Sequence, residues 1–299
     1  MRLDNEIFVK GFRFFNNLDF KHVDLGPYKD NVKNISESEV LSLNVKNCPD
    51  VKITFYFPNY EYEKLPVIMF IHGGGWIGGS SKKISLFAKL LASNGYIVAS
   101  VDYSLAPEYP YPVSTIQLVE VLNYIYNNAF KYKIDKDKIF IGGTSAGAHL
   151  SSQLGCLVTN KKYALKLGVK LDVSKILGLI LINGVYNFDT VGDSHFPGIK
   201  RFLWAYTGEK NFLGYKRLNE LSTMKYMTKD YPSVFVTAGI KDPLRYQSYE
   251  LVEVLKEKNI NYIDEFDVKL NHDFIYELDK KDSRKAYEEI IKFLNDNSK

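Results

Sequence analysis

A serine, an aspartate and a histidine lie in three separate segments of the sequence that could together carry out nucleophilic catalysis. Ser145 lies in "GTSAG" (143–147), Asp242 in "AGIKDP" (238–243) and His272 in "KLNHDF" (269–274). A serine hydroxyl becomes a nucleophile when a neighbouring imidazole removes its proton and a carboxylate orients that imidazole. These residue types, in this order along the chain, predict acyl transfer through an acyl-enzyme.

The serine motif needs support from its surroundings, because Gly-x-Ser-x-Gly also arises by chance and Ser145 could be only a small residue at a tight turn. The run "KIFIGG" (138–143) is typical of a buried strand, and "AHLSSQLGCLV" (148–158) is typical of a helix. Glycines at the ends of the motif permit a sharp turn between them. We therefore expect a strained backbone at Ser145, with its hydroxyl raised above the sheet at a helix N-terminus.

A second glycine cluster could stabilise the oxyanion that such a nucleophile creates. The segment "IHGGGW" (71–76) directly follows an apolar, strand-like run. Consecutive glycines let backbone N–H groups point into a site that side chains would otherwise block. The segment therefore predicts an oxyanion-binding loop, whereas read alone it could be an ordinary strand-to-helix turn.

Five histidines compete for the role of general base, and His272 is the best placed. It follows the last strand-like run and precedes the final helical segment "SRKAYEEIIKFL" (283–294), so its loop returns to the carboxyl edge of a parallel sheet. His149 is expected to pack or to support the site, because it lies one helical turn after Ser145. His72 is expected to shape the glycine loop. His22 and His195 are expected to be structural or exposed.

The carboxylate that orients the imidazole is expected to be Asp242. It lies just past the strand-like run "SVFVTAG" (233–239), at the same sheet edge as the serine and the histidine. Asp267, near the end of the last strand-like run, is the second candidate. Asp273 is adjacent to His272 in sequence but poorly placed to reach its ring.

The elements that must position these residues alternate between strand-like and helical patterns from about residue 65 onward. This alternation predicts an α/β protein with a mostly parallel sheet of eight strands and helices on both faces. The first two strand-like runs alternate between apolar and polar residues, whereas the later ones are continuously apolar, as strands buried on both faces are. The eight runs are 39–45, 51–57, 66–72, 96–103, 138–143, 176–183, 233–239 and 260–266.

Two aromatic-rich segments, 1–38 and about 186–230, do not fit the alternation and are expected to form a helical cap over the sheet edge. The second is too long for an unstructured loop in a compact domain. Its aromatic residues are expected to form a core of its own rather than a cofactor site. The whole chain, 1–299, is expected to be a single domain with these cap elements.

Composition excludes several other classes of protein. The 299 residues are 45% hydrophobic and carry a net charge of only +4, with lysines scattered among acidic residues, so neither nucleic acid nor a membrane surface is the expected partner. The two cysteines lack metal-ligand spacing, and two free thiols fit a reducing compartment. Without a signal-peptide pattern or a long apolar run, the protein is expected to be cytoplasmic.

Five motifs in this order resemble the α/β-hydrolase fold, and within it the esterases similar to hormone-sensitive lipase and the small esterase and arylformamidase group. The resemblance spans about residues 65–295 and is carried by "HGGGW", "DYSLAPEYPYP" (102–112), "GTSAGAHL", "AGIKDPLRYQSYEL" and "NHDF". It implies that Ser145 is the nucleophile, His272 the general base and Asp242 the orienting acid. It also implies an oxyanion hole from the N–H groups of Gly74, Gly75 and Ala146, with Glu108 as a structural acid nearby.

The subfamily is left open by two departures from the pattern. Many esterases similar to hormone-sensitive lipase carry aspartate where this chain has Thr144 and glycine where it has Ala148, and "SAGAHL" is closer to the small esterase and formamidase group. The expected function is hydrolysis of small, soluble carboxylic esters with short acyl chains, without metal or organic cofactor.

Three other functions remain open. They are an arylformamidase or other amidase, a non-catalytic ligand-binding module, and a hydroxynitrile-lyase-like use of the triad. Trp76, Tyr103 and Trp204 are expected to line the substrate pocket. A small-molecule ester is the expected partner. A homo-oligomer is compatible with the sequence, which specifies neither the oligomeric state nor the substrate.

Overall fold

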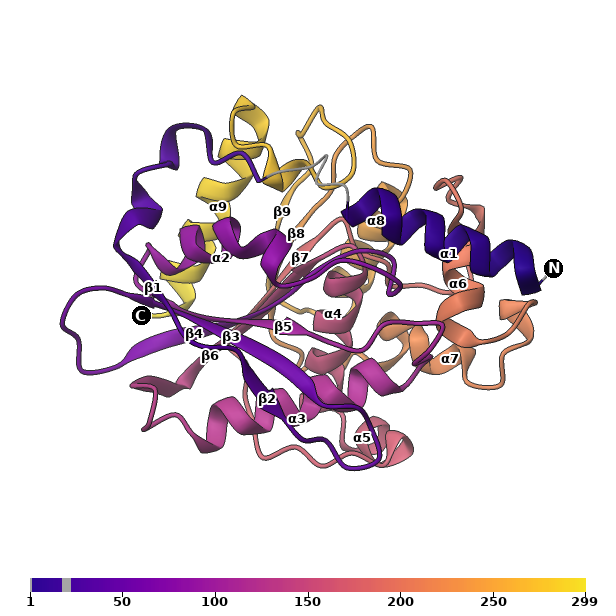
Figure 1. Cartoon of the computed structure of the whole chain (residues 1–299), viewed down its shortest axis with the longest axis horizontal. Coiled ribbons are helices and arrows are strands. Elements are labelled where there is room, and N and C mark those ends of the chain that lie inside the picture. Colours follow the sequence, from indigo (N-terminus) through magenta and orange to yellow (C-terminus); the bar gives the residue numbers. More distant parts are fainter. Residues whose placement is uncertain (1, 18–22) are drawn as a thin grey trace.

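A twisted, mostly parallel sheet forms the centre of the protein (Figure 1). The computed structural model describes residues 2–17 and 23–299, and within these residues the sheet has nine strands in the order β1-β3-β5-β4-β6-β7-β8-β9, with β2 also pairing with β3. Strands β4 to β9 run parallel to one another, whereas β1, β2 and β5 pair antiparallel with β3. The strands are β1 (Ile35–Glu37), β2 (Leu41–Leu43), β3 (Val51–Pro58), β4 (Leu65–Ile71), β5 (Ile97–Asp102), β6 (Ile134–Thr144), β7 (Gly178–Ile182), β8 (Ser233–Thr237) and β9 (Tyr262–Glu265).

The expected α/β fold is confirmed, but the expected number of eight strands is wrong. The segment predicted as one strand over 39–45 is shorter, at Leu41–Leu43, and Ile35–Glu37 forms an additional strand. The sequence "ISE" is too short and too polar to indicate a strand by itself. It becomes one because it pairs with the free edge of β3, where Ile35 lies opposite Pro58.

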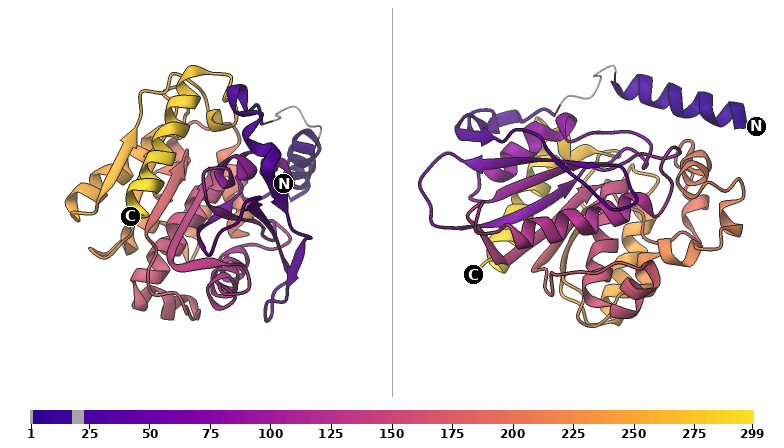
Figure 2. Two further views of the ribbon diagram at one scale, coloured as in Figure 1. Left: turned by 90° about the vertical axis from the view of Figure 1, so that its left-hand side faces the viewer. Right: turned by 60° about the horizontal axis from the view of Figure 1, so that its bottom comes forward.

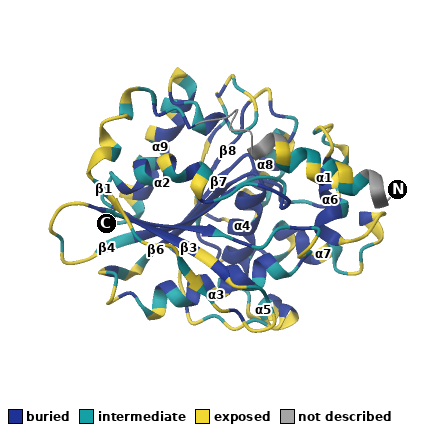
Figure 3. Cartoon of the chain, in the orientation of Figure 1, coloured by how far each residue is buried: buried dark blue, intermediate teal, exposed yellow. Residues whose placement is uncertain are grey.

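Helices cover both faces of the sheet, and alternate residues of each central strand point to opposite cores. In β4, Val67, Met69 and Ile71 belong to one buried cluster, whereas Ile68 and Phe70 belong to the other. The first core lies under α3 (Val113–Asn127), α4 (Ala146–Thr159) and α8 (Arg245–Glu257), and the second under α2 (Ser85–Ala92) and α9 (Lys281–Asn297). Figure 3 shows the buried sheet between these layers.

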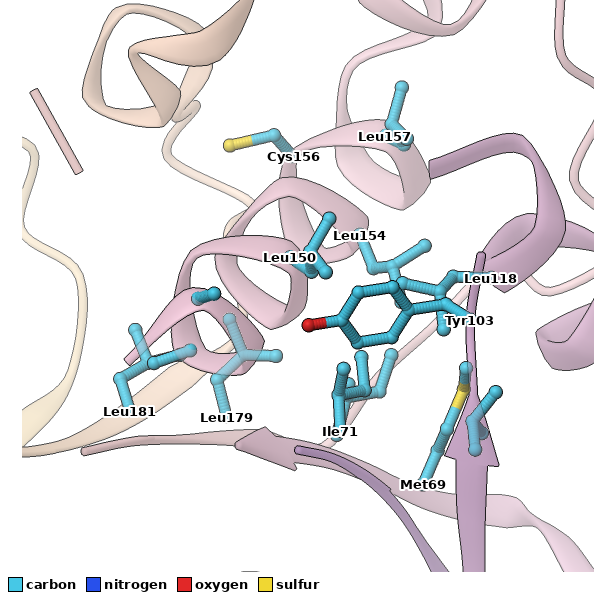
Figure 4. Close-up of a cluster of buried hydrophobic side chains, with 14 of the residues drawn as sticks. Met69, Ile71, Tyr103, Leu118, Leu150, Leu154, Cys156, Leu157, Leu179 and Leu181 are labelled. Carbon is cyan, nitrogen blue, oxygen red and sulfur yellow. The ribbon is translucent and has the colours of Figure 1, made fainter. Parts of the chain in front are cut away.

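The core beneath α3 and α4 is densely packed around Tyr103 (Figure 4). Leu150 and Leu154 of α4 belong to this buried cluster, and Leu118 of α3 lies beside Tyr103. This packing fixes α4, and therefore its first turn, against the sheet. The short helix α5 (Lys161–Leu167) follows, with Asn160 accepting a hydrogen bond from the Tyr163 N–H at its start.

The two segments outside the alternation are only partly a helical cap. Residues 2–17 form α1 (Arg2–Asn17), which lies beside α6 (Ile199–Thr207) in Figure 1 and in the right-hand view of Figure 2. Residue 1 and residues 18–22, which include His22, lie outside the described residues, and Ile35–Glu37 belongs to the sheet. The remaining short elements are α7 (Leu218–Leu221) and the 3-10 turns η1 (Gly26–Tyr28), η2 (Asn31–Asn34), η3 (Lys82–Ile84), η4 (Val191–Asp193), η5 (Phe212–Gly214), η6 (Thr223–Tyr226) and η7 (Phe274–Tyr276).

The aromatic residues of the 186–230 segment do not form a core of their own. Phe188, Phe202 and Tyr206 are buried in the same cluster as the central strands. The segment is therefore continuous with the main core, and it contributes to the architecture around the site. Of the helices that the structure describes, none is long and apolar enough to cross a bilayer.

We expect Leu154→Ala to lower the free energy of unfolding by about 2–5 kcal/mol, because it removes a fully buried side chain from the core beneath α4. The matched control is Leu165→Ala, since Leu165 is 79% exposed, and it should change the free energy by no more than about 0.5 kcal/mol. Chemical denaturation followed by circular dichroism measures both. Equal losses in the two variants would contradict the assigned packing.

Candidate active site

The turn between β6 and α4 presents Ser145 in a strained conformation. Ser145 has φ 53° and ψ −118°, its N–H donates to the Ile182 carbonyl at 2.8 Å, and it is 8% exposed. A residue with a Cβ rarely adopts this region, and such strain persists only where the surroundings enforce it. The enforcing contact is at Gly147, where a Cβ would overlap the Ile71 carbonyl. The expected strained strand-turn-helix is therefore confirmed.

Asp242 and His272 meet at the same edge of the sheet, after β8 and β9. The His272 ring places Nδ1 2.8 Å from Asp242 Oδ2, so Nδ1–H donates to the carboxylate and Nε2 faces away from it. Asp242 is fully buried, and its Oδ1 accepts a hydrogen bond from the Leu244 N–H at 2.9 Å. The acid is thus held by the fold before any substrate binds.

Asn183 is a third contact of this carboxylate that the sequence did not reveal. It ends the run predicted as a strand over 176–183, adopts φ 54°, and its Nδ2–H donates to Asp242 Oδ2. The available signal was a polar residue at the end of an apolar strand, at the edge where the other polar residues gather.

The pKa of Asp242 reflects a balance between burial and hydrogen bonding. Burial raises the pKa, but hydrogen bonding and charge at His272, the Asn183 amide and the Leu244 N–H together hold it below the ordinary value of an aspartate. The carboxylate is therefore ionised at neutral pH, which is the state that accepts a hydrogen bond from an imidazole.

The other two aspartates considered from sequence are placed differently. Asp267 is exposed, and its N–H donates to Glu265 Oε1. Asp273 Oδ1 lies 3.7 Å from His272 Nε2, so the expectation that Asp273 is poorly placed to reach the ring is wrong. It approaches the ring from the side opposite Asp242 and therefore does not take the orienting role at Nδ1. The structure thus brings Asp242, and not Asp267, to the Nδ1 side of the histidine.

The glycine loop, defined as Gly73–Ile77, packs directly against the serine turn. A Cβ built on Gly73 would lie 3.2 Å from the Ser145 Cβ, and Gly74 has φ +113°, a conformation that favours glycine. Among the hydrogen bonds found within residues 2–17 and 23–299, none is donated by the N–H groups of Gly74, Gly75 or Ala146. These three donors are therefore available to a ligand beside Ser145.

His72 fixes the start of this loop, as expected. Its Nδ1 lies 2.7 Å from the Gly73 carbonyl, and its ring stacks on Tyr103 at 4.4 Å between centroids. Burial lowers the pKa of His72, so the neutral ring donates to the carbonyl.

His149, on α4, holds the Trp76 end of the glycine loop. Trp76 Nε1–H donates to His149 Nδ1 at 3.2 Å, which leaves Nε2–H to donate to the Leu221 carbonyl at 3.0 Å. Both ring nitrogens are thus used by the neutral tautomer. Burial lowers the pKa of His149 to about 4, although the bond to Leu221 opposes this shift. His149 therefore joins α4, the loop and the cap, which confirms the expected supporting role.

Two further side chains, Phe196 and Phe202, border the site and were not predicted as site residues. The Phe196 ring lies 5.0 Å from the His272 ring at 64°, and a Cβ on Gly75 would meet the Phe202 ring. Sequence alone marked them only as aromatic residues of the cap.

A hydrogen bond between Thr144 Oγ1 and Tyr276 OH, at 3.0 Å, also joins the serine turn to the segment after His272. It joins the segment after His272 to the turn that carries Ser145.

The three residues expected to line the substrate pocket lie in different surroundings. Trp76 is 2% exposed and stacks on Tyr206 at 4.6 Å, while the Tyr103 hydroxyl donates to the His72 carbonyl. Trp204 is half-buried and lines a cavity of about 820 Å³ together with residues of α1. Substrate contact by these three residues stays a prediction. Within the described part of the chain, no cluster of His, Cys, Asp and Glu is arranged to hold a metal ion.

Comparison with known proteins identifies related chains. Residues 53–255 match the protein family described as BD-FAE. The chain is 34% identical over 109 residues to carboxylesterase NlhH of Mycobacterium tuberculosis. The matched segment is 36% of this chain and 34% of that protein, so the chain spans about a third of the length of this relative. It is 28% identical over 274 residues to an arylesterase of Saccharolobus solfataricus, covering 85% of this chain and 87% of that one.

A solved structure shares the fold across the whole chain. Esterase B of Lactobacillus rhamnosis (HN001) matches with a TM-score of 0.81 and 18% identity, covering 99% of this chain and 96% of the other. The fold is therefore the α/β-hydrolase fold, as the sequence motifs implied.

We expect acid to destabilise the protein through His149. Because its folded pKa of about 4 is below the value of an unfolded histidine, the unfolded state binds more protons between about pH 6.5 and 4. The contribution of His149 to the free energy of unfolding is complete above pH 6.5. About 2–3 kcal/mol of it is lost as the pH falls toward 4. Chemical denaturation at several pH values from 4 to 7 gives the free energy of unfolding at each pH. This free energy should change less steeply with pH in His149→Gln than in the native chain. The exposed His195→Asn should keep the native slope, and an unchanged slope in His149→Gln would contradict the assignment.

Proposed function

This chain belongs to the BD-FAE family, and we propose that it is a serine hydrolase that cleaves carboxylic esters through Ser145, His272 and Asp242. The observation that carries the proposal is the hydrogen bond from His272 to the buried, ionised Asp242, at the sheet edge that also carries the strained serine turn. Relatives named carboxylesterase and arylesterase support the same class of reaction.

In the first half of the proposed reaction, the Ser145 hydroxyl attacks the ester carbonyl carbon while His272 Nε2 removes its proton. The carbonyl oxygen becomes an oxyanion, which accepts hydrogen bonds from the N–H groups of Gly74, Gly75 and Ala146. The carbon–oxygen bond to the alcohol then breaks, and His272 gives its proton to the departing alcohol. The acyl group stays on Ser145.

In the second half, water replaces the alcohol. His272 removes a proton from water as the water oxygen attacks the acyl carbon, and the same loop donors bind the second oxyanion. The bond between the acyl carbon and Ser145 Oγ then breaks, His272 returns the proton to Oγ, and the carboxylic acid leaves. Asp242 stays ionised throughout and stabilises the imidazolium, while its hydrogen bond fixes the tautomer whose Nε2 accepts protons.

The closed surroundings of the serine support small substrates. Ser145 is 8% exposed, and Phe196 and Phe202 border His272 and Gly75. We therefore propose esters with short acyl chains, for which a panel of p-nitrophenyl esters from acetate to palmitate is the direct test, with N-formylkynurenine added for formamidase activity. Rates that rise toward palmitate would contradict the short-chain proposal.

Ser145→Ala should abolish covalent labelling by a fluorophosphonate and lower kcat for p-nitrophenyl acetate by several orders of magnitude, because the proposed acyl-enzyme forms on the Ser145 hydroxyl. Ser93→Ala, at the end of α2, is the control and should label like the native chain. Intact-protein mass spectrometry measures the adduct. Equal labelling of native protein and Ser145→Ala would remove the nucleophile from Ser145.

Asp242→Asn should lower kcat by about 10⁴, since an amide at this position favours the tautomer that cannot accept the serine proton. Asp267→Asn, a like substitution at an exposed aspartate, should be nearly silent. Steady-state kinetics on p-nitrophenyl acetate compares the two. The reverse pattern would transfer the orienting role to Asp267.

A further inference from the structure

Arg13 joins the N-terminal helix to the glycine loop by hydrogen bonds. Its Nε–H donates to the Ile77 carbonyl at 2.7 Å and one terminal nitrogen donates to the Ala106 carbonyl at 2.8 Å. The guanidinium also forms a bidentate pair with Glu108, at 2.8 and 2.6 Å. A planar fork of donors can satisfy acceptors in several directions at once, which the point charge of a lysine cannot.

The acceptors of Arg13 belong to the segments that shape the glycine loop. Ile77 is the last residue of that loop, and its N–H donates to the Gly74 carbonyl at 3.1 Å. The Ala106 N–H donates to the Trp76 carbonyl at 2.9 Å. Arg13 therefore binds the end of the loop that also carries the unused N–H groups of Gly74 and Gly75.

A second contact between α1 and the loop runs through aromatic rings. Phe8 and Phe12, one turn apart on α1, pack edge-on against Phe202 at 5.2 and 5.0 Å. Phe202 in turn lies over Gly75. The helix is thus held to the loop by apolar packing along one side and by Arg13 at its carboxyl-terminal part.

We propose that Arg13 is a positioning residue for the oxyanion hole, so that docking of α1 completes the active site. This inference rests on the proposed ester hydrolysis. Arg13 acts on the reaction through the Ile77 and Ala106 carbonyls, which set the path of Gly73–Ile77. Oxyanion donors contribute only in the transition state, and a displacement of about 1 Å can cost about 100-fold in rate. Loss of Arg13 should therefore lower kcat and leave KM almost unchanged.

The test uses the full chain with Arg13→Gln. For p-nitrophenyl acetate we expect kcat to fall about 10- to 100-fold while KM changes less than about twofold. Arg13→Lys should be intermediate, since one ammonium replaces the cation but not the fork. Lys10→Gln, an exposed cation on the same helix, is the matched control and should keep the native kcat. Thermal denaturation identifies any variant that fails to fold.

Hydrogen exchange gives a readout that does not depend on activity. Amides of residues 73–79 should exchange faster in Arg13→Gln than in the native chain, with α9 unchanged. Glu108→Gln provides a second variant that weakens the same pair, and its effects on kcat should be less than additive with those of Arg13→Gln.

Each outcome has a distinct meaning. Native kcat in Arg13→Gln, a rise in KM alone, or unchanged exchange at residues 73–79 would each overturn the positioning role. If the native chain hydrolysed no ester while Ser145 stayed unlabelled, the proposed function would fall. The exchange experiment would still decide whether Arg13 fixes the loop.

Discussion

The close approach of the turn after β6 to the end of β4 is the constraint on which the rest of the site depends. Because only glycine fits at position 147 against the Ile71 carbonyl, the chain reverses within a few residues and Ser145 adopts φ 53°. Strain of this kind costs about 1–3 kcal/mol, and it is offset by the neighbouring packing. The central pairing of β4 with β6 and the Leu150 and Leu154 contacts of α4 leave the turn no alternative path.

The same edge of the sheet collects one polar residue from each of four strands that follow one another in the sheet. Ser145, Asn183, Asp242 and His272 follow β6, β7, β8 and β9. Parallel strands end together at this edge, so residues that are 30 or 59 positions apart in sequence become hydrogen-bond partners. Asp242 is buried without solvent, yet three donors reach it, and this arrangement keeps the carboxylate ionised where a lone buried acid would be neutral.

The sequence predicted those parts of the structure that are specified locally. Continuously apolar runs located β4 to β8, and the spacing of glycines located the serine turn and the glycine loop, because each signal lies within a few neighbouring residues. Strand β1 was missed, since its pairing partner and not its own composition makes it a strand. Asn183, the Thr144–Tyr276 bond and the contacts of Arg13 were missed for the same reason: partners 59 to 132 positions apart leave no pattern in a single sequence.

The glycine loop is thus held from two sides by groups with opposite physical character. His149 holds it from within the core as a buried, neutral ring, so this support depends on pH and is insensitive to salt. Arg13 holds it from the cap as a partly exposed guanidinium paired with Glu108, so this support is screened by salt. Because both contacts converge on the Trp76–Ile77 end of the loop, the geometry of the donors at Gly74 and Gly75 is a property of the core and the cap together. A change in the cap that alters access to Ser145 therefore also alters the loop that would bind the oxyanion.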